Sequence, residues 1–341
     1  MESLKKSHSN TCTFNRVLFP FSSNEKNKIS STDISSGKLF SVDTWFNPQL
    51  EIIMIGDSTH GTGDFYLYRN YITQCILAKH CFPAVIVEWD MQDVMKLNSY
   101  ILNLSKYKSS REILSRLNRW PQWMWGNEEF EKFVEWLKKY NDKHDKKIKL
   151  YGADLYCKDY NVKQFSDDVE KELYPVTVKN SKIQYRILEA RQNTWNQRVE
   201  HMFEALNILK QYYPRIIFFG HNNHCKKKET VSTSFITLGD LASKKYKIYS
   251  IALISDSGRF LGADKWNGES KTYLLDDPGS NSWENLLKDH KNINKKKGHY
   301  LQLRGAVVTS SKDTKITKIP LHFDMIINKS DTVPITPIEQ V

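Results

Sequence analysis

The sequence predicts an α/β fold with a mostly parallel central sheet flanked by helices. Three observations lead to this fold class. Several short apolar runs are β-branched or aromatic and nearly continuous, as is typical of strands buried on both faces. Segments with apolar residues at helical spacing separate these runs, and such an alternation of strand and helix indicates a parallel sheet. Four of the runs end in acidic or histidine residues.

Apolar residues make up 40% of the 341 residues, which is enough for a sizeable core, and we expect one domain. Residues 1–41 include a long stretch rich in Ser, Asn, Lys and Thr and are expected to be a polar N-terminal lead-in. Residues 42–333 are expected to form the single α/β domain. Helical insertions near 91–140 and 155–212 are expected to cover the carboxyl edge of the sheet, and residues 334–341 to be a C-terminal tail.

The clearest apolar runs predict five strands, at 51–57, 84–90, 147–154, 215–222 and 247–255. Two weaker runs predict further strands at 305–311 and 323–329. Helices are predicted between the strands. Residues 65–80 carry apolar residues at helical spacing, and residues 182–212 form a long helical pattern that ends before a proline. Residues 127–140 place four apolar side chains on one face, with glutamates first and lysines last, which suits the helix dipole.

The formal net charge of +11 could indicate an anionic partner such as nucleic acid, phospholipid or an acidic substrate. The basic residues are scattered, however, and the short lysine runs fall in expected loops. A solvated lysine-rich surface is therefore the favoured interpretation, because charge runs are weak evidence for a partner. The sequence contains no recognised nucleic-acid-binding module, so no nucleic-acid partner is expected.

The cysteine pattern argues against a disulfide framework or a zinc site made of cysteines, because the number is odd and no CxxC occurs. The cysteines are Cys12, Cys75, Cys81, Cys157 and Cys225. No apolar run reaches the roughly 18 residues of a membrane-spanning helix, and no secretory signal is visible at the start of the chain. We therefore expect a cytoplasmic protein without a membrane partner.

The polar residues at the strand ends are the main functional signal. The first strand runs into Asp57 and His60, the second ends in Glu88 and Asp90, the third in Asp154, and the fourth in His221 and His224. The carboxyl ends of parallel strands lie on one edge of a sheet, where open α/β sheets bind ligands. Strand ends are also polar when the chain merely leaves a core, but convergence into one site is the preferred interpretation.

The residue types at these ends are suited to acid–base chemistry. Glu88 follows an apolar strand directly, so its carboxylate needs a partner, and it can hold a histidine or accept a proton. The pair His221 and His224 could instead join the carboxylates in binding a divalent metal, although no HExxH spacing is present. A serine nucleophile is disfavoured because the GxSxG motif is absent, and Cys225 is flanked by lysines.

Eight segments in order resemble the erythromycin esterase family, which includes proteins labelled as succinoglycan-biosynthesis homologues. They cover roughly residues 45–330 and are IGDSTHGTGDFYLYR, FPAVIVEWD, WPQWMWGNEEFEKFVEWLKKYN, KIKLYGADLY, ARQNTWNQRVEHMFEAL, IIFFGHNNHCKKK, TLGDLASKKYKIYSIALIS and HFDMIINK. The resemblance implies hydrolysis of the lactone ester of macrolide antibiotics. It further implies that a histidine acts as general base on water, without a covalent intermediate.

The resemblance also implies which residues form the site. By position, His60 is the general base, Glu88 is the glutamate of the second strand, and Arg69 is the arginine of the first helix. His221 and His224 match the family's late histidine pair. The chain departs from the family at Asp57, where the family usually has glutamate, and the shorter side chain leaves open whether it reaches His60 directly.

The primary hypothesis is therefore an esterase-like hydrolase in which His60, oriented by Asp57 or Glu88, deprotonates water. Oxyanion stabilisation is expected from His221, His224 or Arg69. The expected partner is a small-molecule ester or lactone, and no cofactor is expected. A metal-dependent hydrolase using the same His and Glu residues is the first alternative, with a divalent metal as its cofactor. A non-catalytic binding protein with a basic surface is the second. The sequence does not determine the oligomeric state.

Overall fold

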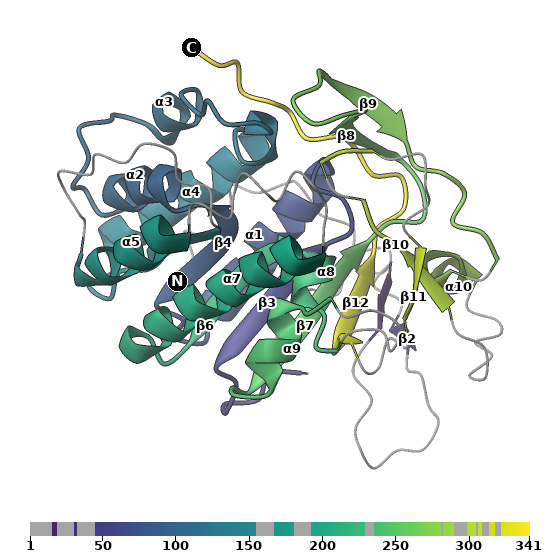
Figure 1. Cartoon of the computed structure of the whole chain (residues 1–341), viewed down its shortest axis with the longest axis horizontal. Coiled ribbons are helices and arrows are strands. Elements are labelled where there is room, and N and C mark those ends of the chain that lie inside the picture. The colour runs from purple at the N-terminus through teal and green to yellow at the C-terminus, as the bar shows by residue number, and fades with distance from the viewer. Residues whose placement is uncertain are drawn as a thin grey trace, which may run out of the picture.

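The computed structural model describes residues 16–18, 31–32, 45–154, 167–180, 192–228, 235–280, 282–289, 299–304, 306–308, 314–317 and 322–341. Within these residues the chain forms a parallel sheet with helices on both faces (Figure 1). The predicted α/β fold class is thereby confirmed. Parts of the predictions lie outside the described residues: 155–166 and 181–191 of the second helical insertion, and 305 and 309–311 of the weak strand at 305–311.

The main sheet has the strand order β2-β1-β12-β7-β3-β6-β4-β5. The six strands from β12 to β5 run parallel, and β1 pairs antiparallel with β12. The parallel strands are β3 (Ile52–Asp57), β4 (Ala84–Asp90), β5 (Lys149–Asp154), β6 (Ile216–His221), β7 (Ile248–Ile254) and β12 (Met325–Asn328). Each lies within a predicted strand. The short strands β1 (Arg16–Leu18) and β2 (Ser31–Thr32) come from the segment expected as a polar lead-in.

Two layers of helices cover the sheet. One apolar core contains Ile53 and Ile55 of β3 and side chains of α1 (Gly63–Leu77), α3 (Ser110–Leu114) and α4 (Glu128–Lys143). The other core contains Ile52 and Met54 and side chains of α5 (Asp168–Asn180), α7 (Gln192–Tyr212), α9 (Leu238–Ser243) and α10 (Trp283–Asp289). Alternate residues of a strand therefore face different cores, which explains the near-continuous apolar runs.

The remaining elements lie at the edges of these layers. Helix α2 (Met91–Ile101) follows β4 and packs beside the edge strand β5, contributing to both cores. A short 3₁₀ turn (Gln122–Met124) precedes α4, and the one-turn helix α8 (Asn222–Cys225) follows β6. Two antiparallel pairs were not predicted: β8 (Arg259–Ala263) with β9 (Ser270–Leu274), and β10 (His299–Gln302) with β11 (Thr314–Thr317).

The weak strand prediction at 305–311 is not supported by the residues that are described there. Residues 306–308 contain one isolated bridge, between Ala263 and Val307, and no strand. The sequence predicts residues 334–341 to be a C-terminal tail. In Figure 1 these residues lie along the top of the molecule, and the C-terminus ends beside α3. Ile335 and Ile338 of this segment are buried.

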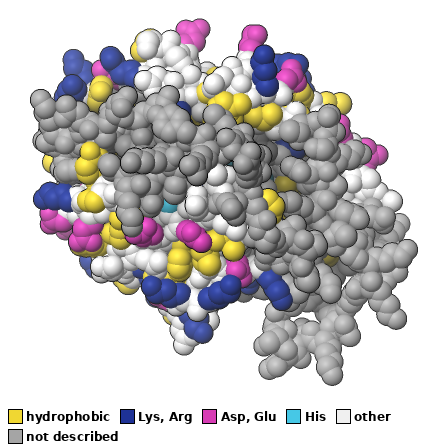
Figure 2. Space-filling view, in the orientation of Figure 1, with side chains coloured by type: hydrophobic (Ala, Val, Ile, Leu, Met, Phe, Trp, Pro, Cys, Tyr) yellow, Lys and Arg dark blue, Asp and Glu magenta, His cyan; other side chains and the backbone are white. Residues whose placement is uncertain are grey.

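The opposite, amino edge of the sheet carries a separate surface groove. Its volume is about 530 Å³, and its lining includes Glu51, Lys210 and Tyr246, which lie close to where β3, β6 and β7 begin. Figure 2 shows Lys and Arg side chains along this lower edge, with Asp and Glu nearby. None of the predicted site residues lines the groove. No helix among the described residues is both long and apolar enough to cross a membrane.

Candidate active site

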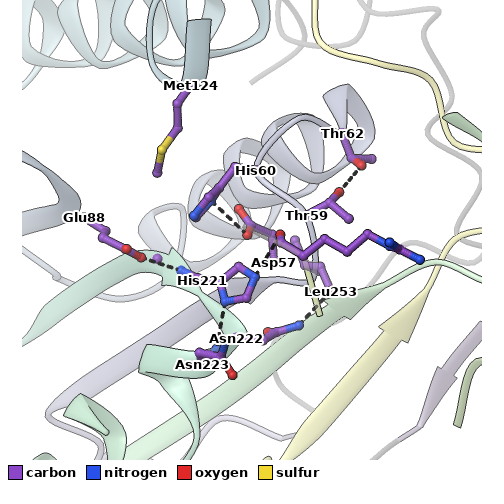
Figure 3. A network of polar contacts seen from close by, with 12 residues as sticks. Asp57, Thr59, His60, Thr62, Glu88, Met124, His221, Asn222, Asn223 and Leu253 are labelled. Carbon is purple, nitrogen blue, oxygen red and sulfur yellow. Dashed lines mark hydrogen bonds and ion pairs between the residues drawn. The ribbon is translucent and has the colours of Figure 1, made fainter. Parts of the chain in front are cut away.

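The carboxyl edge of the sheet brings the predicted residues together. Asp57 at the end of β3 lies in register with His221 at the end of β6, because these strands are parallel neighbours. Glu88 belongs to β4, which lies on the other side of β6. Figure 3 shows the side chains of Asp57, His60 and His221 close together, with Glu88 bonded to His221. Adjacent strands in the sheet, distant in sequence, therefore build one polar cluster.

Asp57 is anchored by Arg69 of α1. A guanidinium nitrogen of Arg69 lies 2.6 Å from Asp57 Oδ2, and the same nitrogen donates to the carbonyl oxygen of Gly220 at 2.5 Å. Nε of Arg69 donates to the carbonyl oxygen of Ile55 at 3.3 Å. Burial alone would raise the pKa of Asp57, but the charge of Arg69 and then His60 outweigh it and hold this pKa below its ordinary value. Asp57 is thus a buried, ionised carboxylate.

His60 stands beside this carboxylate, with its Nδ1 3.3 Å from Asp57 Oδ1. The shorter Asp57 side chain therefore lies directly beside His60 as an ion-pair partner, at a separation just beyond the usual range of an N–H···O hydrogen bond. Burial alone would lower the pKa of His60, but the Asp57 carboxylate raises it above its ordinary value. Tyr66 donates to the backbone carbonyl of His60 at 3.1 Å, which helps to hold the turn after β3.

Glu88 joins the two late histidines. One carboxylate oxygen, Oε2, accepts from the backbone N–H of His221 at 2.7 Å. The other, Oε1, lies 3.1 Å from Nε2 of His224. A bulkier residue at Gly220 would crowd this carboxylate, since a Cβ there would lie 2.9 Å from Oε2. Burial alone would raise the pKa of Glu88, but His224 and then Arg198 hold this pKa well below its ordinary value.

Arg198 and Asp154 complete the polar cluster. Arg198 of α7 makes two bonds to Asp154, at 2.9 and 2.7 Å, and one to Glu88 at 2.8 Å. Its Nη1 lies 3.3 Å from Nε2 of His224. The ring of Trp195, one turn earlier on α7, stacks on the His224 ring at 4.6 Å between centroids. The arginine thus compensates two buried carboxylates from adjacent strands.

The tautomer of His221 follows from its partners. Its Nδ1 accepts from the backbone N–H of Asn223 at 3.2 Å, so in the neutral ring Nε2 carries the hydrogen. That Nε2 lies 3.2 Å from the carbonyl oxygen of Arg304, which accepts this hydrogen. Burial and then the nearby His60 lower the pKa of His221 to about 3. His221 is therefore a neutral hydrogen-bond donor at ordinary pH.

All six predicted site residues lie in this cluster: Asp57, His60, Arg69, Glu88, His221 and His224. The sequence prediction missed Arg198, which lies in the quoted arginine-containing helix, and it did not select Asp154 although this residue ends a predicted strand. The sequence did contain a signal for Arg198: Glu88 and Asp154 both end buried strands, and a buried carboxylate requires a positively charged partner.

Other nucleophiles and ligand sets find less support among the described residues. Cys225 is a buried free thiol, and burial raises its pKa well above the ordinary value, so it is a poor nucleophile. The described residues contain no group of three or more His, Cys, Asp or Glu side chains placed to hold a metal ion. The carboxylates of Asp57, Glu88 and Asp154 are instead compensated by arginines.

Comparison with solved structures shows the same fold in other proteins. A succinoglycan biosynthesis protein is 15% identical, with a TM-score of 0.66 over 85% of this chain and 90% of that one. A Bacillus cereus protein is also 15% identical, with a TM-score of 0.64 over 86% and 91%. A mutant of the erythromycin esterase EreC in its open conformation is 13% identical, with a TM-score of 0.61 over 86% and 93%.

The sequence also matches a family model. The erythromycin esterase model matches residues 77–180 and 166–324, which together span more than half of the chain. This range includes Glu88, His221 and His224, whereas Asp57 and His60 precede it. The chain belongs to the erythromycin esterase family.

Proposed function

We propose that this protein hydrolyses an ester or lactone, with His60 as the general base that activates water. The observation that carries this proposal is the Asp57–His60 pair, held by Arg69. In the tautomer that carries its hydrogen on Nδ1, 3.3 Å from Asp57 Oδ1, the neutral ring presents Nε2 as a proton acceptor. Family membership supports the reaction class.

In the proposed reaction His60 Nε2 takes a proton from water while the water oxygen attacks the carbonyl carbon. The resulting imidazolium is stabilised by the Asp57 carboxylate, which lies 3.3 Å away and remains ionised. When the tetrahedral intermediate collapses, the alkoxide leaves and receives the proton from His60. The products are a carboxylic acid and an alcohol, and for a lactone both groups stay on one molecule.

The three residues expected to stabilise the oxyanion differ in their surroundings. Arg69 is 2% exposed and its guanidinium is bonded to Asp57 and two carbonyl oxygens, so we assign it to positioning Asp57. His224 is 1% exposed beneath Trp195, so we assign it to positioning Glu88. His221 is the preferred donor, because its ring centroid lies 4.9 Å from that of His60 and its neutral Nε2–H would exchange the carbonyl oxygen of Arg304 for a substrate oxygen.

The experiment is a panel of esters and lactones, including a macrolide, assayed with the wild-type protein and with His60→Ala. We expect hydrolysis of at least one member and a loss of about a hundredfold or more in kcat/KM without His60. The neutral ring is the active form, so activity should rise with pH through a pKa above the ordinary histidine value. Hydrolysis that survives the loss of His60 would refute this mechanism, and a macrolide left intact would exclude that substrate alone.

A further inference from the structure

The last ten residues of the chain, 332–341, form a segment that we call the C-terminal strap. Figure 1 shows it running from β12 over the top of the molecule toward α3. Its apolar side chains Ile335 and Ile338 are only 3% and 5% exposed. The strap lies beyond residue 324, where the match to the family model ends. It is therefore an ordered part of this fold that the family match does not account for.

The strap is bonded to the turn that carries His60. The backbone N–H of Ile335 donates to the carbonyl oxygen of Gly61 at 3.0 Å, and Gly63 N–H donates to the carbonyl oxygen of Val333 at 2.8 Å. An antiparallel bridge lies between these two bonds. Val333 N–H also donates to the Asp64 carboxylate at 2.8 Å. These contacts form a short ladder along the residues directly after His60.

The strap is also bonded to a second turn, the one that begins α4. The N–H of Glu128 donates to the carbonyl oxygen of Thr336 at 2.9 Å, and Ile338 N–H donates to that of Gly126 at 2.8 Å. Thr336 donates through its N–H to Glu129 Oε2 at 3.0 Å and through its hydroxyl to Oε1 at 3.1 Å. Only a few residues of the strap lie between its bonds to the first turn and its bonds to the second turn. The strap therefore fixes the distance between the two turns.

Both turns belong to the site. The second turn carries Trp125, whose indole N–H donates to the backbone carbonyl of Glu88 at 3.2 Å, and Met124, whose carbonyl accepts from Tyr66. Figure 3 shows the Met124 side chain directed toward the region of His60 and Glu88. The second turn is therefore tied to the backbone of Glu88 and, through Tyr66, to the turn of His60, and the strap joins the two turns through further backbone bonds.

We propose that the C-terminal strap is a positioning element of the site, which holds the His60 turn in place relative to the turn that carries Met124 and Trp125. The proposal rests on the proposed function insofar as the position of His60 matters for hydrolysis. An extended segment with several backbone bonds can place a general base more precisely than a free loop can, and small displacements of such a group are costly to catalysis.

The first test separates the backbone bond at Ile335 from its apolar packing. Ile335→Ala keeps the N–H that donates to Gly61 and loses the side chain, whereas Ile335→Pro loses the N–H as well. We expect both variants to have a lower Tm. Only Ile335→Pro should also lower kcat, by about tenfold or more with KM little changed. It should shift the NMR titration of the His60 ring toward the ordinary histidine pKa. Equal kcat and equal His60 titration in the two variants would overturn the proposal.

The second test uses a chain that ends at Asp331 together with a synthetic peptide of residues 332–341. We expect the shortened chain to lose activity and the pKa of His60 to fall toward the ordinary histidine value. Added peptide should restore the activity and the raised pKa in a saturable manner. If the full chain hydrolyses no member of the ester panel, the proposed function fails, but the His60 titration still decides the role of the strap. If the His60 titration is the same in the shortened chain and the full chain, the proposed role of the strap is wrong. If the shortened chain does not fold, the two Ile335 variants decide.

Discussion

At the scale of single residues, Arg198 shows how buried charge is managed in this site. It is the shared partner of Glu88 and Asp154, whose side chains are almost fully buried. Burial alone would raise the pKa of both carboxyls, and compensating positive charge lowers them instead. The arginine therefore helps to keep both acids ionised, at Glu88 together with His224.

Replacing this arginine is expected to destabilise the fold in a pH-dependent way. Arg198→Gln leaves two buried carboxylates without their cation, which costs about 3–5 kcal/mol at neutral pH. The depressed pKa values mean that the arginine's contribution is present above the ordinary carboxyl pKa and fades as pH falls through the lower folded-state values. Chemical denaturation at pH 7 and at pH 3 measures this. A difference in the free energy of unfolding between wild type and variant that is larger at pH 3 than at pH 7 would contradict this expectation.

Asp57 is the position at which the resemblance to the family led us to expect a glutamate. In this structure the aspartate already contacts Arg69 at 2.6 Å and His60 at 3.3 Å, and it is fully buried. An additional methylene would overpack the site, so Asp57→Glu is expected to lower stability by about 1–3 kcal/mol and to leave kcat/KM no higher. Thermal unfolding and the ester panel check this. A more active Asp57→Glu protein would show instead that the aspartate limits catalysis.

At the scale of elements, the turn between β3 and α1 is held on two sides. The carbonyl oxygen of Gly61 accepts from Leu261 of β8 at 2.9 Å and from Ile335 of the strap at 3.0 Å. The glycine itself is needed because strand β8 passes close to it: a Cβ on Gly61 would lie 1.8 Å from the carbonyl oxygen of Leu261. The β8–β9 hairpin, absent from the sequence prediction, thus helps to place His60.

A methyl group at this glycine is therefore expected to displace the turn. Gly61→Ala should lower kcat/KM by about a hundredfold, because backbone must move before the Cβ fits and His60 is the preceding residue. Gly63→Ala is the matched control, since the nearest atom there, the carbonyl oxygen of Pro334, would lie at 3.0 Å. Steady-state kinetics of the two variants compare the sites. Similar losses at both positions would mean that the close approach of β8 is not the deciding constraint, since the Cβ at Gly63 meets the strap and not β8.

At the scale of the whole molecule, three buried carboxylates of the carboxyl edge are paired with arginines. Acids from β3, β4 and β5 face arginines from α1 and α7, the helices on opposite faces of the sheet. A metal ion is a common alternative for stabilising such carboxylates, and it belonged to the second functional hypothesis. The arginines already supply that positive charge in this arrangement.

Metal removal is accordingly expected to change neither stability nor hydrolysis. The check is to dialyse the purified protein against EDTA, measure its metal content, and compare Tm and kcat/KM before and after, with Zn²⁺ and Mg²⁺ added back separately. Unchanged values within about twofold support water activation by His60 alone. Activity that disappears on chelation and returns with one metal would favour the metal-dependent hydrolase instead.

The sequence by itself determined the six parallel strands of the main sheet and the edge on which the candidate site lies. These follow from local patterns: apolar runs buried on both faces, and acids or histidines such as Asp57 and His221 where β3 and β6 end. Only the tertiary structure decided how these groups are paired. The Arg198 bonds to Glu88 and Asp154, and the strap across the His60 turn, join residues far apart in the chain. No local pattern encodes such contacts, because they depend on how the helices and the C-terminus pack around the sheet.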